Sequence, residues 1–131
     1  MYKILLFLLL TSYSFGQNYW QQEANYKIFV DINVKNNRYK GNQEIIYTNN
    51  SNDTLNKIFI HLYFNAFKAS SDMAERLVSG DDVNTRFDIN LKELKPEEEG
   101  YLDVFNLKQD NTDVDSFVSD TILEVTLANP L

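Results

Sequence analysis

The sequence predicts a mostly β domain of antiparallel, sandwich-like sheet, with one short helix and a long acidic loop. Residues 26–34 alternate between apolar and polar side chains, which is typical of a strand with one buried face. Two further segments, 39–48 and 55–63, are rich in β-branched and aromatic residues and are separated by Asn-rich turns. Apolar residues form 44% of the chain, enough to build a core and unlike a disordered composition.

The first 16 residues have the layout of a secretory signal peptide. Lys3 supplies a positive charge, residues 4–10 form an unbroken apolar run, and Ser14 and Gly16 are small residues that suit cleavage before Gln17. A membrane-spanning helix needs about 20 apolar residues, so this run is too short to span. We therefore expect an exported protein, periplasmic or extracellular, with no membrane span and with residues 17–131 as one domain.

The first two expected strands form a hairpin. Residues 26–34 place five apolar side chains on one face, which we expect to be half-buried: Tyr26, Ile28, Val30, Ile32 and Val34. Asn36 and Asn37 then supply turn chemistry, because Asn tolerates the left-handed conformation. The second strand covers 39–48, and Gly41 within it indicates a bulge or a close backbone approach.

A third strand is expected at 55–63, after a turn over 49–54. It carries Ile58, Ile60 and Leu62 on one face and Phe59, His61 and Tyr63 on the other. Apolar groups on both faces are typical of a central or doubly covered strand. The three strands together are predicted to form an antiparallel meander.

The second half begins with a short helix, which Ser71 or Asp72 can cap and which carries Met73 and Leu77 on one face. Residues 79–99 are predicted to be a long acidic loop. Two strands are expected beyond it, at 101–107 and 121–127, joined by an exposed connection over 110–120. The later strand is expected to face inward with Leu123, Val125 and Leu127. Residues 128–131 resemble the end of a strand that continues into a turn. We therefore expect the domain to be incomplete.

The charge distribution argues against a nucleic-acid partner. The chain carries a formal net charge of −7, and residues 72–131 hold fifteen acidic but only five basic side chains. A phosphate backbone would be repelled by this half, and no basic patch with interleaved aromatics offsets it. The chain has no cysteine, which excludes disulfides, thiolate zinc ligands and a cysteine nucleophile.

The residues that carry hydrolytic chemistry are missing from the sequence. A hydrolytic zinc site needs about three converging ligands, and the chain has a single histidine, His61. His61 is interpreted as a structural residue on an aromatic sheet face. No H-E-x-x-H, G-x-S-x-G, P-loop or G-x-G-x-x-G pattern occurs. No catalytic, cofactor-binding or metal-binding residue is therefore assigned.

Two weaker patterns in the sequence have simpler explanations. Asp110, Asp113 and Asp115 are close enough in sequence to surround a hard cation, but a solvated acidic loop is the preferred interpretation. The segments 49–51 and 52–54 match the N-glycosylation pattern, although their turn-forming role explains them as well. The lone Trp20 is expected to pack against the sheet edge.

The order of segments resembles the amino-terminal β domain of M1-family zinc aminopeptidases, especially the secreted bacterial branch. The matching pieces are YWQQ at 19–22, the strand 26–34, YKGNQEIIYTNNS at 39–51, DTLNKIFIHLYFNAF at 53–67, GYLDV at 100–104 and the terminal TILEVTLANPL. They cover most of the chain after residue 16, and none of them is catalytic. The acidic segment 79–99 matches no family motif.

This resemblance implies a saddle-shaped β domain, truncated before a thermolysin-like catalytic domain. In that family the catalytic domain supplies the H-E-x-x-H zinc ligands and a G-x-M-E-N segment that grips the free amino group of the substrate. The implied function is a non-catalytic domain that packs against the catalytic domain of the same chain and helps wall its cleft. Zinc and a peptide substrate are then expected only in the full-length parent.

Two other functions are weighed beside this one. The chain is alternatively a freestanding secreted binding module for a glycan or a protein, with Trp20, Phe59 and Tyr63 as contacts. A complete small hydrolase is the third, which the missing catalytic residues disfavour. An H-E-x-x-H segment encoded after Leu131 would favour the peptidase interpretation, whereas a natural stop there would favour the binding module.

Overall fold

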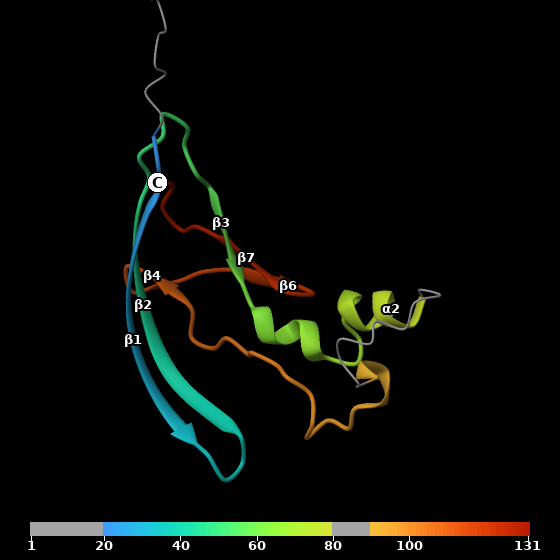
Figure 1. Cartoon of the computed structure of the whole chain (residues 1–131). Helices are drawn as coiled ribbons and strands as arrows, with labels where there is room; N and C mark the ends of the chain where they lie inside the picture. Colours follow the sequence, from blue (N-terminus) through green and yellow to red (C-terminus); the bar gives the residue numbers. More distant parts are fainter. Residues whose placement is uncertain (1–19, 80–89) are drawn as a thin grey trace, which may run out of the picture. The chain divides into compact units, whose positions relative to one another are not determined.

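Figure 1 shows a computed structural model of the chain, which describes residues 20–79 and 90–131. The signal peptide predicted for 1–16 and the part of the acidic loop at 80–89 lie outside the described residues. The fold is mostly β with antiparallel sheets and one short α-helix, as the sequence predicts. The chain divides into two compact units, Met1–Asp53 and Thr54–Leu131, and each is described by itself. None of the described helices has the length and apolar character needed to cross a membrane.

The first unit is a long hairpin of β1 (Glu23–Asn33) and β2 (Arg38–Thr48). The strands pair antiparallel without interruption, from Glu23 opposite Thr48 to Asn33 opposite Arg38. In the turn, the Asn33 carboxamide oxygen accepts the backbone N–H groups of Lys35 and Asn36 at 3.1 and 3.2 Å. Asn37 adopts the left-handed conformation with φ 51°, as Asn readily does. Both strands and their turn are therefore confirmed.

Gly41 marks a close backbone approach and not a bulge. It pairs with Val30 in the continuous register, so no extra residue interrupts the ladder. A Cβ atom at this position would lie 2.5 Å from the carbonyl oxygen of Phe29. Glycine is required here because any side chain would displace the neighbouring backbone.

The half-buried face predicted for the first strand is wrong for the described residues. Tyr26, Ile28, Val30 and Ile32 are between 52% and 68% exposed. The alternation identified the strand correctly, but a two-stranded ribbon has no second layer of its own to cover an apolar face.

The second unit contains a three-stranded antiparallel sheet in the order β3-β7-β6, from β3 (Lys57–His61), β7 (Ile122–Thr126) and β6 (Ser116–Ser119). The predicted meander is wrong, because β3 pairs with β7 and not with β2. The third strand is also neither central nor doubly covered: it forms an edge of this sheet. Pairing with β7 sets Ile58 opposite Val125 and Ile60 opposite Leu123, so the apolar residues share one face.

The core lies on that face of the sheet. Leu62, Leu123 and Val125 are each 2% exposed, and partly buried apolar side chains pack against them: Ile58, Ile60, Leu102, Leu107 and Val114. The inward direction predicted for Leu123 and Val125 is confirmed, and Leu127 is half-buried.

Residues 101–127 differ from the sequence prediction. The strand expected at 101–107 is irregular, because the Leu102 backbone N–H is bound by the Asn65 side chain and not by a neighbouring strand. The connection expected at 110–120 instead contains β6 and β5 (Thr112–Asp113), which pairs with β4 (Lys108–Gln109). Asp110 and Asn111 join β4 to β5 with φ 47° and 69°, as a two-residue type I′ turn requires.

Helical segments lie between β3 and β4. The 3-10 helix η1 (Tyr63–Phe67) takes over from β3 at Tyr63, which is why the third strand is shorter than predicted. The helix α2 (Asp72–Ser79) is confirmed, and Ser71 caps it by accepting the Ala74 N–H at 3.1 Å. Ser71 also donates its hydroxyl to the Ala66 carbonyl at 2.7 Å. A second 3-10 helix, η2 (Leu91–Glu93), lies near the start of the second described range, 90–131.

The last residues return along the start of the second unit. Leu55 and Leu131 exchange two backbone hydrogen bonds of 2.9 and 3.0 Å. The Gln109 carboxamide likewise makes two hydrogen bonds with the Asn129 backbone. It donates to the carbonyl oxygen at 2.8 Å and accepts the N–H at 3.0 Å. A side-chain amide here makes the pair of bonds that a strand backbone would make.

Candidate functional site

His61 lies on the exposed face of β3. Its ring stacks on that of Tyr63, with centroids 5.0 Å apart and planes inclined by 10°. The stack places His61 beside an aromatic ring, and its interpretation as a structural residue stays a prediction. Among the residues that the structure describes, no three His, Asp or Glu side chains converge as a metal site would require. Asp113, one of the three aspartates weighed for a cation, instead pairs with Lys108 at 3.4 Å.

The same face of the β3-β7-β6 sheet carries a row of aromatic side chains. Phe59 on β3 and Phe117 on β6 both lie opposite Glu124 of the central strand, and both are exposed, as is Tyr63. Glu124 forms an ion pair with Lys57. Phe59 and Tyr63 therefore share a unit, whereas Trp20, the third proposed contact, belongs to the hairpin unit and is itself half exposed.

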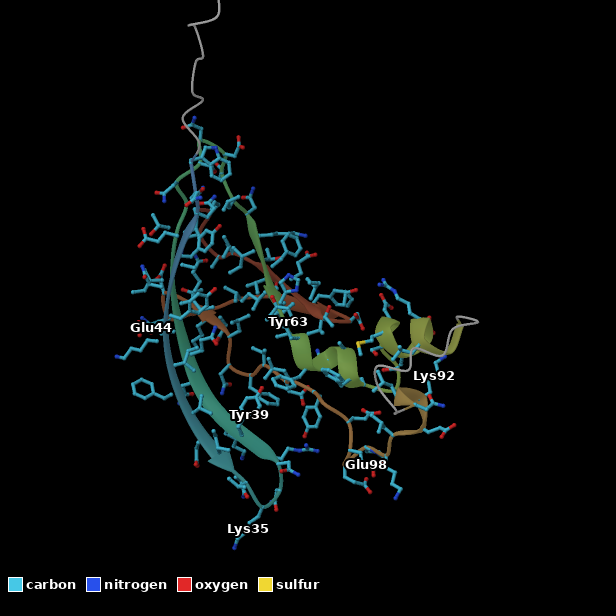
Figure 2. The ribbon with its side chains drawn as sticks, in the orientation of Figure 1. Lys35, Tyr39, Glu44, Tyr63, Lys92 and Glu98 are labelled. Carbon is cyan, nitrogen blue, oxygen red and sulfur yellow. The ribbon has the colours of Figure 1, made fainter. Side chains whose placement is uncertain are left out.

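The β1–β2 hairpin separates apolar from charged side chains. Residues directly opposite each other share a face, so the register defines an apolar hairpin face made of Ala24, Tyr26, Ile28, Val30, Ile32, Tyr39, Gly41, Gln43, Ile45 and Tyr47. No charged residue belongs to it. The charged residues of both strands occupy the opposite face. In Figure 2, Tyr39 and Glu44 project to different sides of the hairpin.

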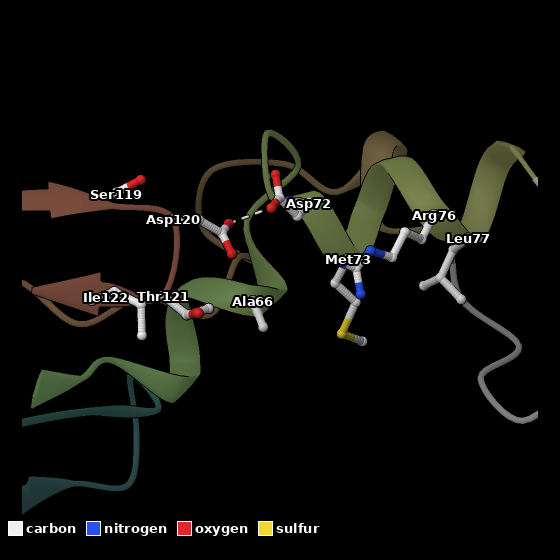
Figure 3. Close-up of a pocket in the computed structure, with 9 residues that line it drawn as sticks. All are labelled: Ala66, Asp72, Met73, Arg76, Leu77, Ser119, Asp120, Thr121 and Ile122. Carbon is white, nitrogen blue, oxygen red and sulfur yellow. Dashed lines mark hydrogen bonds between the residues drawn. The ribbon is translucent and has the colours of Figure 1, made fainter. Parts of the chain in front are cut away.

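The second unit also holds a pocket of about 650 Å³, here named the α2 pocket. It lies between α2 and the turn from β6 to β7, as Figure 3 shows. Its lining combines charged, hydroxyl and apolar side chains: Ala66, Asp72, Met73, Arg76, Leu77, Ser119, Asp120, Thr121 and Ile122. The pocket is widely open to solvent, unlike the clefts that bury most of the surface of a small molecule.

Hydrogen bonds fix Asp120 at the rim of the α2 pocket. Its carboxylate accepts the Asp72 N–H at 3.2 Å across 48 positions of sequence, and its backbone carbonyl accepts from the Asn65 carboxamide at 3.2 Å. The residue adopts the left-handed conformation with φ 48°. Acidic groups near the first turn of a helix are also favoured by the helix dipole.

The sequence alone does not predict this pocket. The sequence predicts Met73 and Leu77 on one face of a helix. The β6–β7 turn, however, falls at the end of the segment 110–120, which is predicted to be an exposed connection. The available signal was the pair Asp120–Thr121 between apolar segments, which suits a two-residue hairpin turn. Even with that signal, local patterning does not place the turn beside α2.

No protein-family model, curated protein or solved structure matches the chain.

Proposed function

We propose that this chain is the non-catalytic amino-terminal β domain of an exported M1-like zinc metallo-aminopeptidase. It packs against a thermolysin-like catalytic domain of the same protein and helps wall the substrate cleft. The observation that carries this proposal is the apolar hairpin face, a sheet surface without a single charged residue. The resemblance of the ordered segments to the M1 family supplies the identity of the partner domain.

The hairpin face suits burial against another layer of protein. Sheets with one apolar face are stable when that face is covered by a helix layer or a second sheet. Large exposed apolar patches in soluble proteins commonly mark interaction sites. Tyr26, Ile28 and Ile32 are each more than half exposed, and burying such side chains stabilises an interface by about 25 cal/mol per Å² of apolar area.

The same proposal assigns different roles to the catalytic domain and to this chain. The catalytic domain holds the zinc ion and contacts the peptide substrate, while this chain contributes scaffold and one wall. No residue of the chain is assigned a catalytic or metal-binding role. The chain alone should therefore neither retain zinc after dialysis nor cleave an aminoacyl anilide, and robust turnover by the chain alone would overturn the proposal.

The decisive experiment compares two charge insertions in the full gene product. Ile28→Lys lies on the apolar hairpin face, and Asn42→Lys places the same charge on the opposite face of the same hairpin. Ile28→Lys should lower the thermal stability of the whole protein and its aminopeptidase activity, whereas Asn42→Lys should leave both close to the parent values. Equal effects of the two variants, or a gene product without an H-E-x-x-H helix, would contradict the proposal.

A freestanding binding module is the second candidate, and the row formed by Phe59 and Phe117 favours it. Two exposed aromatic rings on either side of one strand provide a platform for stacking. This candidate predicts that the chain alone binds a glycan or a protein partner, and that Phe59→Ala abolishes binding. Loss of binding on substitution of the aromatic row, with no effect of Ile28→Lys, would favour the module over the peptidase domain.

A further inference from the structure

We propose that the open edge of β3, here named the β3 edge, is a self-association surface. A second copy of this chain adds its own β3 there, antiparallel to the first, and extends the sheet. This inference does not rest on the proposed function, because it concerns only the second unit and is measured as self-association. It follows from the direction of the backbone groups of β3, from the side chains on its two faces and from the charges at the two edges of the sheet.

The hydrogen bonds at the two ends of β3 show which of its backbone groups point away from the sheet. Leu62 donates its N–H to the Thr121 carbonyl at 2.7 Å, and the Asn56 carbonyl accepts the Leu127 N–H at 2.9 Å. Both pairs continue the register of β3 with β7. Because bonded and non-bonded pairs alternate along an antiparallel ladder, every second residue of β3 points its N–H and C=O away from β7: Lys57, Phe59 and His61.

These outward groups can pair with the same groups of a second copy. In the part of the chain that the structure describes, β7 is the one strand that neighbours β3, and an open strand edge is a template for another strand. A two-fold axis at Phe59 sets this residue opposite Phe59 of the second copy, and sets Lys57 opposite His61 of the second copy. Each outward N–H of one copy then meets an outward carbonyl of the other, as a closed dimer with identical surfaces requires.

The side chains of the two copies also match on both faces of the sheet, because residues directly opposite each other share a face. Ile58 lies opposite Ile60 of the second copy. Both residues are partly buried and pack against the core, so the apolar layer continues across the axis. On the other face Phe59, which is 63% exposed, meets Phe59 of the second copy, and burial of these side chains favours association.

Charge distinguishes the β3 edge from the opposite edge of the sheet, here named the β6 edge. The one permanently charged side chain of β3 is Lys57, and it forms an ion pair with Glu124 of its own sheet. Asp115 and Asp120 instead flank β6. Two copies that paired through β6 would bring these carboxylates close together, and charges of this kind protect a strand edge from pairing. The β3 edge is therefore the edge that accepts a second copy.

The β6 edge supplies matched controls. Thr126 donates its N–H to the Asp115 carbonyl at 2.9 Å, in the register of β6 with β7. By the same alternation, the backbone groups of Ser116 and Val118 point away from β7. The two edges therefore carry outward amides of the same kind, and the same substitution can be made at each.

The test measures self-association of the whole chain by sedimentation equilibrium at concentrations up to about 1 mM. We expect a reversible equilibrium between monomer and dimer, since one short strand from each copy makes a small interface. Hydrogen exchange of the same samples locates the contact. The amides of Lys57, Phe59 and His61 should exchange more slowly as the dimer fraction rises, whereas those of Ser116 and Val118 should keep their rates.

The first pair of variants removes one outward N–H from each edge. Phe59→Pro deletes the donor at the axis and keeps the β3–β7 ladder, because proline is tolerated where its nitrogen faces away from the neighbouring strand. Both copies of a dimer carry the change, so two hydrogen bonds are lost and association should weaken about tenfold or more. Val118→Pro makes the same change at the β6 edge and should leave association unchanged.

The second pair of variants adds one charge beside each edge without removing a backbone donor. Phe59 and Phe117 both lie opposite Glu124, so a lysine at either position has the same partner within the monomer. Phe59→Lys sets two like charges opposite each other across the axis and should weaken association severalfold. Phe117→Lys should leave association unchanged, and circular dichroism confirms that each variant is folded.

Three results would overturn the inference. The first is a chain that stays monomeric at about 1 mM, and the second is an equal effect of a Phe59 variant and its control at the β6 edge. The third is self-association that survives both Phe59 variants and is lost in Ile28→Lys, because the interface would then lie on the apolar hairpin face.

Discussion

The side chain of Asn65 binds the backbone of Leu102, accepting its N–H at 2.8 Å. The same carboxamide donates to the Asp120 carbonyl, and the residue is 1% exposed. One buried side chain thus connects η1 to the backbone of Leu102 and of Asp120, which lie far from it in the sequence. The bond gives the Leu102 N–H a side-chain partner in place of a neighbouring strand.

Replacing Asn65 with alanine should lower the free energy of unfolding of the second unit by about 2–4 kcal/mol, because two hydrogen bonds are lost and partly buried backbone groups lose their partners. Chemical denaturation of the two proteins measures the difference. Asn56→Ala is the control, since the Asn56 side chain is exposed and its loss should cost less than about 0.5 kcal/mol. Similar values for both variants would show that Asn65 does not hold these segments together.

Ser71→Ala should destabilise the start of α2 by about 1–2 kcal/mol, because the hydroxyl is the cap of the helix. The effect is measured as faster hydrogen exchange of the α2 amides. Ser70→Ala removes the hydroxyl of the exposed preceding residue and should change exchange little. An unchanged exchange rate in Ser71→Ala would mean that the cap contributes nothing to the helix.

Gly41→Ala should disrupt the hairpin, because the new Cβ would lie 2.5 Å from the Phe29 carbonyl oxygen. Backbone atoms cannot rotate away as a flexible side chain can, and the expected strain of about 1–3 kcal/mol corresponds to roughly fivefold or greater loss of amide protection in β1 and β2. Asn42→Ala on the adjacent position is the control. Retained protection in Gly41→Ala would show that the paired strands accommodate the new Cβ without strain.

The ion pair between Lys57 and Glu124 should contribute little to stability. The two side chains are 51% and 34% exposed, and pairs of this kind are worth less than about 1 kcal/mol. A double-mutant cycle with Lys57→Met and Glu124→Gln measures the coupling, which should fall further in high salt. A coupling above about 2 kcal/mol that persists in salt would contradict this expectation.

The elements that local patterning specifies were predictable. The alternation from Tyr26 to Val34 and the Asn residues at the turn were sufficient for β1, β2 and their connection, because a hairpin joins neighbours in sequence. The helix start at Ser71 was also predictable, since capping depends on a few adjacent residues.

The pairing of distant strands was not predictable in the same way. β3 pairs with β7, and Lys57 and Glu124 are 67 positions apart, so no local pattern connects them. The β4–β5 turn carried a usable signal in Asp110–Asn111, which the acidic composition of the region obscured. The α2 pocket depends on contact between segments far apart in sequence, since Asp72 and Asp120 are 48 positions apart.

The contact between Gln109 and Asn129 depends on one atom, the Gln109 Nε2 that donates to the Asn129 carbonyl oxygen. Deamidation of Gln109 would replace the donating N–H₂ by an oxygen, which would then face the Asn129 carbonyl oxygen and repel it. Asparagine is one methylene shorter and would fall short of the same two atoms. Ageing of the protein at alkaline pH would therefore be expected to release residues 128–131 from this contact, while the sheet of β3, β7 and β6 stays intact.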